Sequence, residues 1–143
     1  MRILGLDIGD ARIGLALSDP QGILASPLTI INRTDENKDI SAILDIVHKN
    51  DVGRIIMGLP LSMADGGLSA QAEKIQAFAV ALSRRSDIPV EFRDERLSTV
   101  SAKRLMHGVR KTARGIRYDA IAAALILQGY LDESALDDGG QVF

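Results

Sequence analysis

Three acidic residues, far apart in the sequence, lie within or next to apolar segments, where a carboxylate is unusual. Asp7 interrupts the apolar run Arg2–Ile8, Glu95 follows the alternating run Val90–Asp94, and Asp119 precedes an alanine-rich apolar segment. An unpaired carboxylate buried in a strand costs several kcal/mol, and acids that converge repel one another unless a cation lies between them. Hard divalent ions prefer oxygen ligands, so convergence of these acids predicts a site for Mg²⁺ or Mn²⁺.

Each acid also has an interpretation without chemistry. Asp119 could be the N-cap of a helix or a favourable charge at the positive end of its dipole. Glu95 could form a surface ion pair with a neighbouring arginine. The two-residue alternation of the preceding strand leaves open whether Asp94 or Glu95 points toward Asp7. The strand position of Asp7 is the hardest to explain without a cation.

Basic residues concentrate in residues 84–117, which hold ten Lys or Arg against four Asp or Glu. The local net charge is therefore +6 in a chain of net charge −2, and the rest of the chain carries −8. Such a segment is typical of an anion-binding face, although a solvated helix surface would have the same composition.

The elements that would position these residues follow from the apolar periodicity. Three consecutive strands are predicted first, joined by turn sequences, and Pro27 favours an edge position for the third because proline donates no ladder hydrogen bond. Helices and strands then alternate, which favours parallel crossovers. The predicted strands are Arg2–Ile8, Ile13–Ser18, Ile23–Asn32, Arg54–Met57 and Val90–Asp94, and the predicted helices are Ile40–Val47, Ala70–Ser83, Thr99–His107 and Ala120–Leu131.

The pattern predicts an α/β domain over residues 1–131. Its mixed five-stranded sheet has three antiparallel and then two parallel strands, with helices on both faces. The apolar period ends at Leu131, and acidic and glycine residues follow, so we expect residues 132–143 to form a flexible acidic tail. With 143 residues, 46% of them hydrophobic, one globular domain is expected. The chain has no cysteine and no long apolar run, which predicts a soluble cytoplasmic protein without disulfides.

Four segments resemble a known family in their order and separation. They are "LGLDIGDARIGLALSD", "IIMGLPLSMADG", "VEFRDERLST" and "YDAIAAALILQGYL". Together they closely resemble the YqgF family, also called RuvX, over residues 2–131. The resemblance implies an RNase H-like fold and a bacterial nuclease that helps to mature the 5′ end of 16S ribosomal RNA from its precursor.

The resemblance also implies which acids bind metal. The family's metal ligands fall on Asp7 in Asp-Ile-Gly, on Glu95 in Asp-Glu-Arg and on Asp119 in Tyr-Asp-Ala, so the family selects Glu95 over Asp94. These three residues would be catalytic by holding Mg²⁺ or Mn²⁺. The reaction would be hydrolysis of a phosphodiester by two-metal chemistry.

Basic side chains near these acids are candidates for nucleic-acid binding, because Lys and Arg contacts to phosphates supply most non-specific affinity. The candidates are Arg12, Arg96, Arg110, Lys111 and Arg114. The predicted partner is a ribosomal RNA precursor in preference to a DNA junction, with no membrane involved. Two alternatives remain, a Holliday-junction resolvase acting on branched DNA and a non-catalytic nucleic-acid-binding module. The sequence leaves open whether the protein is a monomer or a homodimer.

Overall fold

The computed structural model describes residues 1–60, 69–94 and 114–142, and within the last range it describes the side chains of 118–135. Along the chain the elements are β1 (Arg2–Ile8), β2 (Arg12–Ser18), β3 (Ala25–Asn32), α1 (Glu36–Lys49), β4 (Val52–Leu59), α2 (Ala70–Arg84), β5 (Val90–Asp94) and α4 (Arg114–Val142). Every predicted element that falls within these ranges is present. The predicted helix Thr99–His107 lies outside the described residues.

The strands form one mixed sheet in the order β3-β2-β1-β4-β5. β1 pairs antiparallel with β2, and β2 pairs antiparallel with β3, whereas β4 pairs parallel with β1 and β5 pairs parallel with β4. The predicted arrangement of three antiparallel and two parallel strands is therefore confirmed. β3 lies at the edge of the sheet, as Pro27 predicts.

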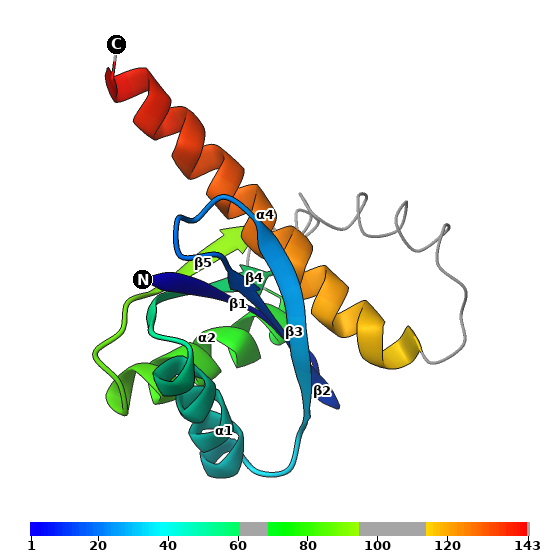
Figure 1. Ribbon diagram of the computed structural model, residues 1–143. Coiled ribbons are helices and arrows are strands. Elements are labelled where there is room, and N and C mark those ends of the chain that lie inside the picture. The colour runs from blue at the N-terminus through cyan, green and yellow to red at the C-terminus, as the bar shows by residue number, and fades with distance from the viewer. Residues whose placement is uncertain (61–68, 95–113, 143) are drawn as a thin grey trace.

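Helices cover both faces of this sheet, as Figure 1 shows. Because side chains alternate along a strand, Leu4, Leu6 and Ile8 of β1 point to the face covered by α1 and α2. There they pack with aliphatic residues of β2 and β4 and with the apolar stripes of the two helices. This core also contains Ile13, Leu15, Ile40, Ile43, Val47, Ile55, Met57, Ile75, Phe78 and Leu82.

The opposite face, which α4 covers, is built from much smaller residues. A Cβ atom added at Gly5 would lie 2.8 Å from Cβ of Leu127 and 3.0 Å from the carbonyl oxygen of Ala123. Real Cβ atoms do not approach other atoms so closely. The glycine therefore lets the helix backbone come closer to the sheet than a larger residue would allow. Ala16 and Ile56 complete the contact with α4.

Polar contacts fix α4 along its length. Gln128 donates to the carbonyl of Ile23 at 3.0 Å and accepts from the backbone N–H of Ala25 at 2.9 Å. Farther along the helix, the Tyr130 hydroxyl accepts a hydrogen bond from Arg54 of β4 at 2.6 Å, which together with the nearby Glu91 carboxylate raises the pKa of Arg54. These bonds tie α4 to both the antiparallel and the parallel halves of the sheet.

α4 is longer than the segment predicted for it. The apolar pattern predicts Ala120–Leu131, but the helix spans the 29 residues Arg114–Val142. Apolar periodicity marks only the part of a helix that is buried, and here the polar flanks on both sides also have helical backbone. Residues 132–142 are thus helical where the sequence predicts that the regular pattern ends, while the mobility of 132–143 stays a prediction. Among the described helices, none is long and apolar enough to cross a membrane.

Candidate active site

Asp7 lies one residue before the end of β1, on the face of the sheet that α4 covers. Its register partner on β2 is Gly14, and residues opposite each other in an antiparallel pair share a face. Its neighbours in the strand, Leu6 and Ile8, point into the opposite core. Asp7 itself is half-buried. The strand thus directs this carboxylate away from the aliphatic core and toward α4.

Asp119, which is distant from Asp7 in the sequence, lies at the same end of the β1–β2 pair. A Cβ atom at Gly14 would overlap the carbonyl oxygen of Asp119, so the backbone of α4 rests directly on this glycine. Since Gly14 is the register partner of Asp7, two acids distant in sequence lie at one end of the β1–β2 pair. The N-cap interpretation of Asp119 is wrong, because α4 begins at Arg114 and Asp119 lies more than one turn inside it.

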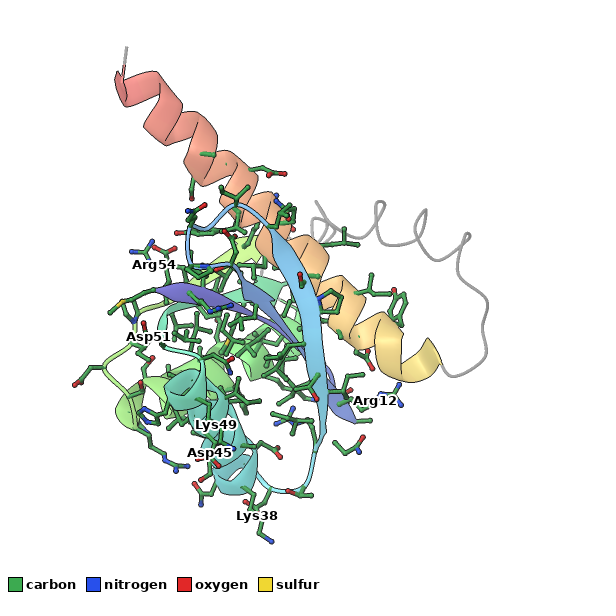
Figure 2. The ribbon with its side chains drawn as sticks, viewed as in Figure 1. Arg12, Lys38, Asp45, Lys49, Asp51 and Arg54 are labelled. Carbon is green, nitrogen blue, oxygen red and sulfur yellow. The ribbon has the colours of Figure 1, made fainter. Side chains whose placement is uncertain are left out.

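Arg12 forms an ion pair with Asp119. Its Nε donates to Oδ2 of Asp119 at 2.7 Å, across 107 residues of sequence, and the two side chains are 44% and 20% exposed. Figure 2 shows Arg12 beside the N-terminal part of α4, whereas Arg54 lies at the opposite end of the sheet. The sequence pointed to Arg12 as a phosphate contact and gave no indication that it pairs with this acid.

The register of β5 shows on which face Asp94, one of the two candidates for the third acid, lies. Asp94 pairs with Leu59 of β4, which belongs to the core under α1 and α2, so Asp94 lies on that face and not on the face of Asp7. Arg93 lies on the α4 face, where it packs against Gly129 and donates to Glu133 at 2.9 Å. Glu95 lies outside the described residues.

The predicted basic contacts are only partly within the described chain. Arg96, Arg110 and Lys111 lie outside the described residues. Arg114 is the first residue of α4, and the description there is limited to its backbone. The structure therefore places Asp7, Asp119 and Arg12 together, and it does not describe the remainder of the predicted site.

Two side chains that the sequence did not point to bind backbone carbonyls at the end of β1. Arg33 donates from Nη1 to the carbonyl of Gly9 at 3.1 Å and from Nε to Asp39 at 3.2 Å. Gln71 of α2 donates to the carbonyl of Ile8 at 3.4 Å. Asp39 is only 2% exposed. The sequence held one sign that Asp39 is buried. It lies one helical turn before Ile43 and Val47, on the same apolar stripe of α1.

The donor chemistry of the site fits a hard divalent ion. Asp7 and Asp119 offer carboxylate oxygens, the ligands that Mg²⁺ and Mn²⁺ prefer. Among the described side chains, those of residues 1–60, 69–94 and 118–135, no group of three or more His, Cys, Asp or Glu is close enough to hold a metal ion. Two carboxylates alone are fewer ligands than such a site needs, and Glu95, the third acid that the resemblance implies, lies outside the described residues.

Comparison with known proteins decides the family. A family model described as "RuvX: Holliday junction resolvase" matches residues 1–133. The chain belongs to the RuvX family. Curated relatives agree over nearly the whole length, and both the resolvase description and the relatives' names refer to enzymes that cleave nucleic acids. This RuvX chain is accordingly a member of a nuclease family.

Two relatives illustrate the similarity. A protein of Desulforamulus reducens is 43% identical over 137 residues, which cover 94% of this chain and 99% of the relative. A protein of Dehalococcoides mccartyi is 46% identical over 127 residues, which cover 89% and 95%. Each carries the name "Putative pre-16S rRNA nuclease".

Solved structures show that RuvX shares the RNase H-like fold. The RuvC resolvase of Thermus thermophilus, in complex with a Holliday junction substrate, superposes with a TM-score of 0.61 at 13% identity, covering 94% of this chain and 96% of that one. The fowlpox virus resolvase with its junction DNA gives 0.54 at 14% identity, covering 93% and 98%. Likeness at this identity establishes the fold, and the predicted fold class is confirmed.

Proposed function

We propose that this chain is a divalent-metal-dependent nuclease that cleaves the precursor of 16S ribosomal RNA during maturation of its 5′ end. The observation that carries the proposal is the contact of the Asp119 backbone with Gly14, the register partner of Asp7. It brings together two of the three acids that the sequence singles out. The names of the relatives support the choice of substrate. A ribosomal RNA substrate also implies a cytoplasmic location.

Asp7, Glu95 and Asp119 would hold Mg²⁺ or Mn²⁺. Support for Glu95 comes from the described part of β5, in which Arg93 faces α4 and Asp94 faces the other way. Continued alternation would direct Glu95 to the side of Asp7. Such an ion, when bound, lowers the pKa of water and stabilises charge on the leaving oxygen of a phosphodiester.

The protein's own groups orient the site. Arg12 holds one oxygen of Asp119 and so fixes the direction of that carboxylate. An arginine has five N–H donors, so the guanidinium that binds Asp119 can also bind a phosphate oxygen of the substrate. We assign Arg96, Arg110, Lys111 and Arg114 to contacts along the nucleic-acid backbone, where each cation would strengthen binding in a salt-dependent way.

Branched DNA is the second candidate substrate, favoured by the description of the family model. A junction has two-fold symmetry, and symmetric cutting would need two copies of this chain. Processing of a ribosomal RNA end has no such requirement. The two substrates thus predict different oligomeric states as well as different products.

The test compares single-stranded RNA spanning a 16S precursor 5′ end with a four-way DNA junction, each with Mg²⁺, with Mn²⁺ and with chelator. We expect metal-dependent cleavage of the RNA that is lost in Asp7→Asn, Glu95→Gln and Asp119→Asn. A matched control is Asp45→Asn, which makes the same change on the exposed surface of α1. It should cut like the wild type.

Other outcomes would change the assignment. Symmetric junction cutting by a dimer would favour the resolvase. RNA binding without any cleavage would leave a non-catalytic binding module. Full activity in the three acid variants, with circular dichroism showing intact folding, would refute the metal site.

A further inference from the structure

A groove of about 590 Å³ runs between the edge strand β3 and the N-terminal half of α4. One end of it lies next to the Arg12–Asp119 ion pair, because Asn32 in the groove is the register partner of Arg12. On the helix side, Ala120 and Ile121 directly follow Asp119. The groove is thus continuous with the candidate active site. Its described lining residues are Pro27, Leu28, Thr29, Ile30, Asn32, Ala120 and Ile121.

The lining combines an apolar surface with a few polar groups. Leu28, which is 40% exposed, and Ile121 supply apolar contact area, while Asn32 lies at the end nearest to Arg12. An asparagine amide offers both a donor and an acceptor, which is the combination that pairs with the edge of a nucleobase. Volumes between 300 and 1,000 Å³ are roughly those of small-ligand pockets, so one nucleotide would fit.

The strand edge beside the groove is unsuited to pairing with another strand. The register of β3 shifts between Thr29, which pairs with Leu15, and Pro27, which pairs with Ala16, so Leu28 is the extra residue of a β-bulge. A bulge twists an edge and redirects a side chain, and a proline removes one backbone donor. Addition of a peptide strand or of a second copy through this edge is therefore disfavoured.

We propose that this groove binds one unpaired nucleotide of the substrate, beside the phosphate that lies at the Arg12–Asp119 end. The inference rests on the nuclease function proposed above and specifies its substrate as single-stranded. The Arg12 guanidinium has N–H donors besides the Nε that binds Asp119, and these can bind a phosphate oxygen at one end of the groove, while the apolar walls complement a base and sugar. A base that is stacked and paired in a duplex cannot enter such a groove, whereas a splayed base can.

The first test measures binding without catalysis. A short fluorescent single-stranded RNA that spans the 16S precursor 5′ end is titrated with wild-type protein in EDTA and followed by anisotropy. We expect Leu28→Glu and Asn32→Ala to raise Kd about tenfold, the size of a lost base contact or greater. Val80→Glu is the matched control, because Val80 is 51% exposed on α2, against the other face of the sheet, and its substitution adds the same charge. The control should leave Kd within about twofold of wild type.

The second test removes the base instead of the pocket. RNA substrates with single abasic positions around the cleavage site are cut by wild type and by both groove variants. Wild type should lose about tenfold in kcat/KM at one position, mainly through KM, and the groove variants should show no further loss at that position.

The outcomes separate this inference from the proposed function. If wild type cleaves no nucleic acid and binds none, the proposed function fails first. If wild type cleaves RNA but both groove variants bind and cut like Val80→Glu, the groove assignment alone is refuted. A dimeric wild type that becomes monomeric in Leu28→Glu would also overturn it, since a second copy would then occupy the groove.

Discussion

The two faces of the sheet are built on opposite principles. Toward α1 and α2, the strands present large aliphatic side chains such as Leu6 and Ile55, which are fully buried. Toward α4, β1 and β2 present Gly5, Gly14 and Ala16, and β4 adds the large side chain of Ile56. Burial of large apolar side chains supplies most folding free energy, so the first face contributes more to stability. The second face contributes less apolar area and allows a much closer approach.

That close approach is what brings the acids together. A helix packed over large side chains usually lies 8–10 Å from its neighbour, roughly the distance set by interdigitating side chains. Over Gly14 the backbone of α4 itself touches the sheet, which places Asp119 beside β1 and within reach of Arg12. One face of this sheet therefore holds the large aliphatic core, and the other brings Asp7, Asp119 and Arg12 together.

The largest loss of stability should come from the aliphatic face. Ile55→Ala is expected to lower the free energy of unfolding by about 2–5 kcal/mol, because Ile55 is fully buried and its removal leaves a cavity. Nuclease activity per folded molecule should stay close to wild type. Urea denaturation and a cleavage assay at low temperature measure the two quantities. A loss of activity larger than the unfolded fraction explains would break the division between the faces.

Gly14→Ala should give the reverse profile. One added methyl group would overlap the Asp119 carbonyl and push the start of α4 away, at an overpacking cost of about 1–3 kcal/mol. Cleavage should fall far more than stability, by about a hundredfold or more, since a small displacement of catalytic groups is enough. The same denaturation and cleavage assays measure the two losses. Wild-type cleavage in Gly14→Ala would show that the close contact is dispensable.

The buried Arg33–Asp39 pair sharpens the comparison, because it belongs to the aliphatic face yet holds Gly9 at the end of β1. Asp39→Asn keeps the shape but removes the charge opposite Arg33. The expected destabilisation is about 1–2 kcal/mol, at the lower end for charged hydrogen bonds because Arg33 is partly exposed. A decrease in kcat with KM unchanged would indicate that the pair positions the β1–β2 turn. If the variant cuts as fast as wild type under conditions where both proteins are fully folded, the pair has only a structural role.

Tyr130→Phe should have the smallest effect. It removes the hydroxyl that accepts from Arg54 and leaves the ring in place, at a cost of about 0.5–1.5 kcal/mol. Because this contact lies at the opposite end of the sheet from Arg12, cleavage should be unchanged (Figure 2). Thermal unfolding and the RNA cleavage assay provide the check. Loss of cleavage without loss of stability would mean that anchoring of α4 at this distant point controls the site.

Much of the fold could be predicted because its signals are local. Apolar runs predicted the first four strands and alternation predicted the fifth, and the change to helical spacing after Asn32 predicted the parallel half of the sheet. Pro27 predicted the edge strand from its missing donor alone. The ends of α4 were not predicted, since polar residues outside the buried stretch carry no apolar period.

The candidate site was less predictable, because its contacts are non-local. The type and position of Asp7 indicated a functional acid, yet nothing near Asp119 or Arg12 in the sequence indicated that they form an ion pair. Strand alternation also left Asp94 and Glu95 equivalent. Only the pairing of Asp94 with Leu59 shows that Asp94 lies on the face of the sheet that α1 and α2 cover.

By itself the sequence determined the elements, the mixed sheet and the presence of a carboxylate in the first strand, because each follows from the preferences of neighbouring residues. Tertiary structure alone decided which residues meet at that carboxylate. Gly14 looks like an ordinary strand glycine until α4 is placed on it, and Asn32 gains a groove only when β3 and α4 lie side by side. The physical reason is that close approach depends on two surfaces at once, and each is encoded in a different part of the chain.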